Sequence, residues 1–257
     1  MRTLPIGSKT YGSMPVSILE SNEQLGAKAA DHFSELLKTV VREQDRADII
    51  LATGNSQLTF ISALRVEREL PWDRVAVFHM DEYLGMSEQH PASFARYIRE
   101  RLVNFVHPAA FYPIFGNSND VNMEMRRYAD LLRNRPPDIC ALGIGENGHL
   151  AFNDPPADFD TKEVMKIVNL DYKCRMQQVN EGHFQTIDDV PRQAFTLTIP
   201  TLLSAKHVLA VVPEARKASA VKSALEGPVT PRCPASILRT KSNVMMYLDR
   251  ESASLLS

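Results

Sequence analysis

The chain has 257 residues, of which 44% are hydrophobic and 23% charged, so it fits one large α/β domain or two small ones with a sizeable core. Its formal net charge of −2 excludes the broad basic surface of a protein that binds nucleic acid or an anionic membrane. No apolar run reaches the roughly 18 residues of a membrane span, and residues 1–5 lack the apolar core of a signal peptide.

The first half of the chain alternates apolar runs of strand length with amphipathic helical patterns. Strands are expected at residues 15–19, 47–52 and 75–80. Helices are expected from Ser21, a capping residue, to 42–46, and then at 58–69, 91–105 and 122–134.

The second half continues this alternation. Strands are expected at residues 139–144, 164–168, 195–199, 208–212 and 244–248, and helices at 200–205 and 215–226. No internal repeat, low-complexity segment or linker interrupts the chain. Residues 1–257 are therefore expected to form a single α/β domain with a parallel sheet and helices on both faces.

The stretch from Asp138 to Pro156 combines a buried strand with a glycine-rich loop. Glycines at 143, 145 and 148 follow the apolar run, and the loop then carries the imidazole of His149 and the carboxylate of Asp154. A parallel strand that feeds such a turn is typical of a site at its carboxyl end. A plain turn with a solvent-exposed histidine is the alternative interpretation.

Three other places put polar groups at strand ends or helix starts. Residues 53–56 form a Gly/Ser-containing turn between a strand and a helix, which favours an anion site or an ordinary helix cap. Asp81 and Glu82 follow a strand, and this position indicates either catalytic carboxylates or the start of a solvated loop. Arg216 and Lys217 begin a helix, where cations oppose the helix dipole and indicate either a local need for positive charge or surface exposure.

Several stretches resemble one family in the same order and spacing. They are Leu51-Ala52-Thr53-Gly54, Met80-Asp81-Glu82-Tyr83-Leu84-Gly85, Gly143 to Pro155, and Lys217-Ala218 through Leu225-Glu226-Gly227. Together they are similar to the glucosamine-6-phosphate deaminase/isomerase family, which shares its fold with 6-phosphogluconolactonases. The resemblance covers roughly residues 15–250. It implies a Rossmann-like three-layer α/β/α fold with a mostly parallel sheet, no metal or organic cofactor, and conversion of glucosamine 6-phosphate and water to fructose 6-phosphate and ammonia.

The resemblance also implies catalytic roles. His149 matches the histidine that opens the sugar ring, and Asp81 matches the base that moves a proton between C2 and C1. Asp154 stands where the family places a glutamate that orients the histidine. Asn147 stands where many members carry aspartate, so one negative charge near His149 is absent.

The expected phosphate site is less regular. Lys217 matches a phosphate-binding lysine, and Thr53, Gly54, Asn55 and Ser56 match the phosphate loop. The phosphate arginine of the family does not align, because Gly182 falls near its position; Arg175 is the expected substitute. Glu82 and Gly148 are further expected substrate contacts, Glu82 a secondary one.

Other functions fit parts of the pattern. A lactonase on the same fold would also use a Gly-His loop, but Met80 to Tyr83 is not its pattern. A non-catalytic sugar-phosphate sensor would need neither Asp81 nor His149, and a deaminase of another amino sugar phosphate, such as galactosamine 6-phosphate, would need both.

A small phosphorylated amino sugar is the expected partner, without nucleic acid or membrane. The chain is compatible with a homo-oligomer, and three cysteines without framework spacing suit the cytoplasm.

Overall fold

The computed structural model describes residues 4–67 and 69–257. The expectation about a signal peptide lies partly outside this range, since it includes residues 1–3, and the expected helix at 58–69 includes the undescribed residue 68. Within the described range, every helix is too short or too polar to cross a membrane.

Eight strands form the central sheet in the order β1-β2-β11-β10-β7-β3-β4-β6. All neighbours are parallel except β1 and β2. The strands are β1 (Gly7–Tyr11), β2 (Met14–Leu19), β3 (Ala47–Leu51), β4 (Val75–His79), β6 (Ala110–Tyr112), β7 (Ile139–Leu142), β10 (His207–Val212) and β11 (Val244–Asp249). The predicted α/β class with a mostly parallel sheet is confirmed.

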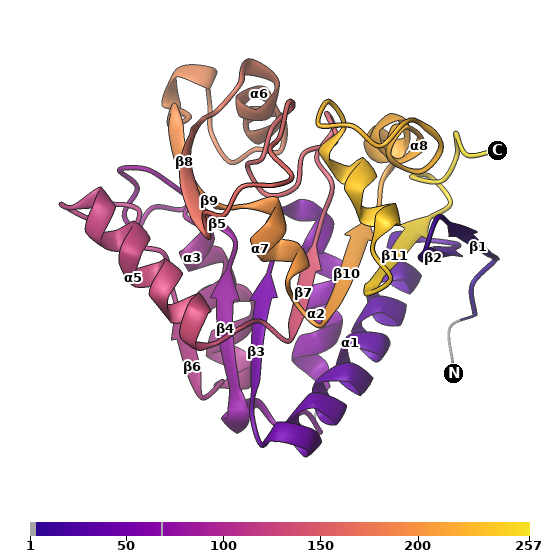
Figure 1. The fold of residues 1–257 in the computed structure, drawn as a ribbon, viewed down its shortest axis with the longest axis horizontal. Helices are drawn as coiled ribbons and strands as arrows, with labels where there is room; N and C mark the ends of the chain where they lie inside the picture. Colours follow the sequence, from indigo (N-terminus) through magenta and orange to yellow (C-terminus); the bar gives the residue numbers. More distant parts are fainter. Residues whose placement is uncertain (1–3, 68) are drawn as a thin grey trace.

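Two layers of helices enclose this sheet (Figure 1). One apolar cluster joins a face of the sheet to α1 (Asn22–Gln44), α2 (Leu58–Val66) and the segment from α3 (Phe94–Ile98) to α4 (Asn104–Val106). The other face packs against α5 (Val121–Asn134), α7 (Ile199–Leu203) and α8 (Ala218–Glu226). Strands buried on both faces explain why their sequences are continuously apolar rather than alternating.

A second, antiparallel sheet was not expected from the sequence. It contains β5 (Asp81–Tyr83), β9 (Gln193–Leu197) and β8 (Met165–Asn169) in the order β5-β9-β8. With α6 (Tyr172–Asn180) it shares a small aromatic-rich core. Residues of both sheets also belong to one larger core, which supports a single domain, as we propose.

The helix expected at 91–105 is shorter and less regular than predicted. It begins at Phe94, where Ser93 Oγ accepts a hydrogen bond from Arg96 N as the N-cap, and changes to a π-helix at Arg99–Val103 before α4. Pro91 therefore does not begin the helix. In contrast, Ser21 caps α1 as predicted, by accepting a hydrogen bond from Gln24 N.

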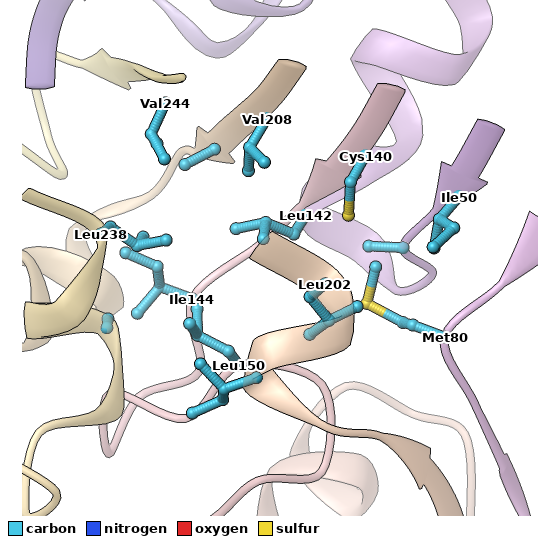
Figure 2. Packing of buried hydrophobic residues seen from close by; sticks show 14 of the residues in the cluster. Ile50, Met80, Cys140, Leu142, Ile144, Leu150, Leu202, Val208, Leu238 and Val244 are labelled. Atoms are coloured by element: carbon cyan, nitrogen blue, oxygen red, sulfur yellow. The ribbon is translucent and has the colours of Figure 1, made fainter. Parts of the chain in front are cut away.

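The chain order reverses between β3 and β7, which makes this a topological switch point. In open α/β sheets, ligands bind in the crevice outside the carboxyl ends of the strands at such a point. Figure 2 shows that Ile144 and Leu150, on either side of the expected histidine loop, pack into the core with Leu142 and Leu202. The core thus anchors both ends of the loop that carries His149.

Candidate active site

A cavity lies at the carboxyl ends of β3, β4, β7 and β10. Polar residues from separate segments line it, including Thr53, Ser56, Asp81, His149, Glu181 and Lys217. The structure therefore brings the expected base, the expected ring-opening histidine and the expected phosphate lysine together at one cavity.

Asp81 is held in a short strand rather than in a loop. It lies in β5, pairs with Thr196 of β9, and is only 6% exposed. Burial, and secondarily the charge of Glu82, raises the pKa of Asp81 well above its ordinary value. A desolvated carboxylate is a stronger base than one in water, so Asp81 is suited to accept a proton from a ligand in the cavity.

The loop after β7 turns tightly beneath the imidazole of His149. Gly148 N donates to Gly145 O at 3.0 Å, Gly145 N donates to His149 O at 3.0 Å, and Gly148 has a φ of +85°. A Cβ atom added at Gly145 would lie 2.2 Å from the imidazole of His149. Glycine at 145 is thus required by the close approach of the ring.

Asn147 and Asp154 hold His149 from the side facing away from the cavity. Asn147 Oδ1 accepts from His149 N at 3.0 Å, while its Nδ2 donates to Asp154 Oδ1 at 3.0 Å. His149 Nδ1 lies 3.1 Å from the same Asp154 oxygen, an ion-pair distance. Although aspartate is one methylene shorter than the glutamate of the family, Asp154 therefore reaches the histidine directly.

The electrostatics of this pair favour an ionised Asp154. Burial raises the pKa of Asp154, but the hydrogen bond and charge of His149 and the amide of Asn147 outweigh it and leave the pKa below its ordinary value. Asp154 is thus an acceptor that orients the imidazole of His149.

His149, Asp154 and Cys174 are also the described residues that could hold a metal ion. Their ligand atoms all lie within 4.8 Å of one another. However, burial raises the pKa of the Cys174 thiol well above its ordinary value, and a metal requires the thiolate. The cluster therefore fits a hydrogen-bonded support for His149 better than it fits a metal centre.

The cavity lining includes a buried lysine, Lys217, that has no partner among the described residues. Lys217 is 2% exposed, lies in the turn that follows β10, and lines the cavity together with Thr53, Gly54 and Ser56. Within the described residues, its ammonium makes no hydrogen bond or ion pair. Burial, and secondarily the charge of Arg216, lowers the pKa of Lys217. A buried cation in a cavity lining is chemically suited to pair with an anion.

The sequence of this chain matches a known protein family over most of its length. The model of the family described as glucosamine-6-phosphate isomerases/6-phosphogluconolactonase matches residues 20–247. The chain belongs to this family. A glucosamine-6-phosphate deaminase of Exiguobacterium sibiricum is 38% identical over 241 residues, which cover 93% of this chain and 92% of that protein. A deaminase of the same name from Bacillus cytotoxicus is 33% identical over 95% of this chain and 90% of that protein.

Solved structures of the family share the fold. A monomeric glucosamine-6-phosphate deaminase superposes with a TM-score of 0.85 at 33% identity, covering 93% of this chain and 99% of that one. A 6-phosphogluconolactonase of Shewanella baltica superposes with a TM-score of 0.76 at 19% identity, covering 94% and 98%. The second likeness shows the fold alone.

Glu82 was expected to contact the substrate, but it does not line the cavity. Its carboxylate points to the start of α3 and accepts hydrogen bonds from Ser93 Oγ, Phe94 N and Ala95 N, as well as from Tyr83 N. Burial raises the pKa of Glu82 to about 7 against these hydrogen bonds. Neighbouring residues of a strand face opposite ways, so Asp81 faces the cavity and Glu82 braces the helix.

Three other expected substrate contacts also lie outside the cavity lining. Arg175 donates to the backbone oxygens of Ile187 and Val190, so it closes a surface loop and is not the substitute for the phosphate arginine. Asn55 donates to the backbone oxygen of Glu181 at 3.3 Å, and Gly148 forms the turn beneath His149.

The sequence interpretation missed the contribution of α6 and the residue after it. Gln177, Gln178 and Glu181 line the cavity, although this polar segment was not assigned to a helix. Glu181 immediately precedes Gly182, the position near which the family places its arginine, so the signal was a charge of the opposite sign at the expected phosphate site.

Proposed function

We propose that this family member converts glucosamine 6-phosphate and water to fructose 6-phosphate and ammonia. The observation that carries the proposal is the single cavity that Asp81, His149 and Lys217 line together. The named deaminases at 33–38% identity support it, because they match nearly the whole chain. The substrate is a small phosphorylated amino sugar.

In this proposal His149 opens the pyranose ring. Its Nδ1 faces Asp154, so Nε2 is the nitrogen that serves the ring oxygen of the sugar. Asp154 fixes the orientation of the imidazole, while Asn147 fixes the loop. The imidazole then delivers a proton to the ring oxygen as the C1–O5 bond breaks, while the anomeric hydroxyl loses its proton and becomes the C1 carbonyl.

Asp81 acts on the open chain. It removes the proton from C2 and returns a proton to C1, which converts the amino aldose into an imine at C2. Water then adds to C2, and cleavage of the C2–N bond releases ammonia and leaves the ketose. The burial that raises the pKa of Asp81 strengthens it as a base. The ammonium group of the substrate favours the ionised carboxylate when it enters the cavity.

Lys217 holds the phosphate at one end of the cavity, together with Thr53, Gly54 and Ser56 of the loop after β3. This end lies at the start of the turn Asn55–Gln57 that leads into α2. The loop amides and the ammonium supply charge-assisted hydrogen bonds to the phosphate oxygens.

A lactonase is a weaker candidate, because a lactone needs no C2 base, whereas Asp81 is a buried carboxylate facing the cavity. A pure sensor needs neither Asp81 nor His149.

We further propose a cytoplasmic location, which the free thiols of Cys140, Cys174 and Cys233 support. A homo-oligomer stays a prediction for light scattering, and a monomeric relative is known.

The test is ammonia release from a panel of glucosamine 6-phosphate, galactosamine 6-phosphate and unphosphorylated glucosamine, with 6-phosphogluconolactone hydrolysis measured in parallel. The proposal predicts ammonia from glucosamine 6-phosphate at the highest kcat/KM. Highest activity on galactosamine 6-phosphate would change the assigned sugar. Lactone hydrolysis without ammonia release would overturn the assigned reaction.

A further inference from the structure

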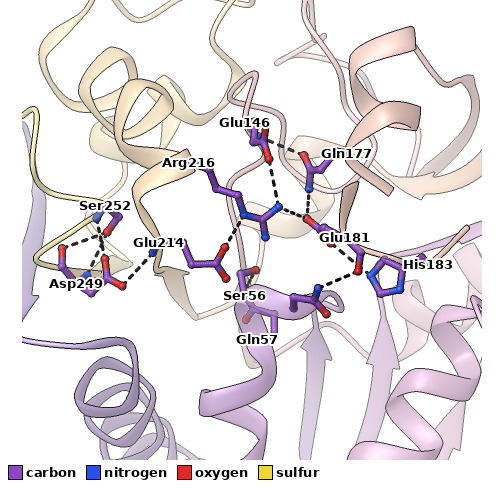
Figure 3. A network of polar contacts seen from close by, with 11 residues as sticks. Ser56, Gln57, Glu146, Gln177, Glu181, His183, Glu214, Arg216, Asp249 and Ser252 are labelled. Atoms are coloured by element: carbon purple, nitrogen blue, oxygen red, sulfur yellow. Dashed lines mark hydrogen bonds and ion pairs between the residues drawn. The ribbon is translucent and has the colours of Figure 1, made fainter. Parts of the chain in front are cut away.

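A cluster of charges surrounds Arg216 at the phosphate end of the cavity (Figure 3). Arg216 precedes Lys217 in the same turn. Its guanidinium donates to Glu181 Oε1 at 2.6 Å and to Glu146 Oε1 at 3.2 Å, and it also contacts Glu214. Arg216 thus binds three carboxylates of the protein through Nε and Nη1, whereas the ammonium of its neighbour Lys217 binds none among the described residues.

Glu181 differs from the other two carboxylates because it lines the cavity. Its side chain is 6% exposed, compared with 40% for Glu146 and 31% for Glu214. Its Oε2 atom lies 3.8 Å from the point where a Cβ of Gly54 would stand. The carboxylate of Glu181 therefore lies over the loop that is proposed to hold the phosphate.

Several donors hold the Glu181 carboxylate in this place. Gln177 Nε2 donates to Oε1 at 2.8 Å, Arg216 binds the same oxygen, and His183 Nε2 lies 3.4 Å from Oε2. Asn55 of the phosphate loop donates to the backbone oxygen of Glu181 at 3.3 Å. This set of donors resembles the environment that a phosphate oxygen requires.

The local charge balance opposes a phosphate while Glu181 stays there. Two cations, Arg216 and Lys217, face the three carboxylates of Glu146, Glu181 and Glu214. A phosphate dianion would add like charge next to the buried carboxylate, which is costly at short range in a site of low dielectric. If Glu181 leaves, the same guanidinium can bind phosphate oxygens in a bidentate way.

We propose that the Glu181 carboxylate occupies the place of the substrate phosphate, and that the phosphate displaces it and takes over Arg216 as its second cation beside Lys217. This rests on the proposed function and deepens it, because it names the residue that replaces the missing phosphate arginine. It also gives a basis for specificity: a neutral C6 hydroxyl cannot compete with Glu181 for the guanidinium, whereas a phosphate dianion can.

The proposal predicts how phosphate affinity changes in single variants. Calorimetry would measure the binding of inorganic phosphate to the full chain. Glu181→Gln should bind phosphate about tenfold more tightly than the wild type, and Arg216→Gln about tenfold more weakly, which is the scale of one charge-assisted hydrogen bond. Arg216→Lys keeps the charge but loses the bidentate geometry, and should also weaken binding. In the double variant, the gain from Glu181→Gln should be lost.

Glu146→Gln is the matched control. It removes the same charge from the same guanidinium, but Glu146 does not line the cavity, so phosphate affinity should change by less than about twofold. Equal gains in Glu146→Gln and Glu181→Gln would overturn displacement and leave a general charge effect. Unchanged or weaker phosphate binding in a folded Glu181→Gln variant would also overturn it. Lys217→Ala should abolish the binding, which locates the anion.

The two proposals fail in different ways. Absence of ammonia release from glucosamine 6-phosphate by the wild type would overturn the proposed reaction but leave the phosphate measurements to decide on Glu181 and Arg216. Ammonia release with normal KM in Arg216→Gln would overturn the role of the arginine and leave the reaction intact.

Discussion

At the residue scale, the imidazole of His149 must face the sugar on one side and Asp154 on the other, where Nδ1 lies 3.1 Å from Asp154 Oδ1. His149→Gln keeps a side chain of similar size but removes the proton shuttle. Turnover of the closed-ring sugar phosphate should fall by about 100-fold, the usual scale of general acid catalysis. An open-chain analogue, which needs no ring opening, should lose much less. Equal losses on both forms, measured as kcat, would instead assign His149 to a later step.

Glu181 gives the chain a measurable response to acid. Burial raises the pKa of Glu181, but His183, Arg216 and Gln177 outweigh it and lower the pKa to about 2. A carboxyl whose folded-state pKa is depressed stabilises the fold above its unfolded-state pKa of about 4.5 and loses that contribution as the pH falls toward 2. Urea unfolding at pH 5 and pH 3 should therefore show a smaller loss of stability in Glu181→Gln than in the wild type. Identical losses would show that the ion pair does not stabilise the fold.

Gly145 tests the close approach beneath the imidazole. The added Cβ of Gly145→Ala would lie 2.2 Å from the ring of His149, so the ring must move. A displacement of about 1 Å at a reacting group costs about 100-fold in rate, so kcat should fall on that scale while phosphate affinity stays. Gly7→Ala, whose Cβ would meet nothing closer than 3.6 Å, is the control and should keep full activity. Normal kcat in Gly145→Ala would contradict the assigned position of His149.

At the element scale, the strand β5 and helix α3 are coupled through Glu82 and Ser93. Ser93 Oγ donates to Glu82 Oε2 at 2.7 Å and caps α3 through Arg96 N. Ser93→Ala should cost about 1–2 kcal/mol in the free energy of unfolding, which corresponds to a few degrees in Tm. Calorimetry checks this against Ser21→Ala, which removes one exposed cap bond of 3.4 Å and should cost less. An equal or larger loss in Ser21→Ala would contradict the coupling.

The elements of the main sheet could be predicted because their strands are buried on both faces. β3, β4 and β7 are continuous apolar runs, and the alternation with helices predicts their parallel pairing. β5 was missed because it has three residues, Asp81, Glu82 and Tyr83, whose partner β9 lies more than a hundred residues away. Such pairing depends on tertiary contacts that local patterns do not encode.

At the scale of the whole molecule, the sheet brings together residues that the sequence separates. The loops after β3, β4, β7 and β10 meet at one edge because parallel strands end there together, so Thr53, Asp81, His149 and Lys217 could be predicted to converge. Arg175 and Glu181 could not be placed from the sequence, because the orientation of α6 over the small sheet decides which of its side chains face the cavity. The phosphate end of the site is therefore where the structure changes the interpretation most.

The central claim is that this cavity enolises an amino sugar phosphate with Asp81 as the base, and exchange of the C2 hydrogen with solvent tests it most directly. Asp81→Asn keeps the size of the side chain but removes the base. The account predicts that C2 exchange, followed by magnetic resonance in deuterated water with glucosamine 6-phosphate, falls by about 100-fold or more, while inorganic phosphate still binds. Exchange at C2 at the wild-type rate in a folded Asp81→Asn variant would contradict it.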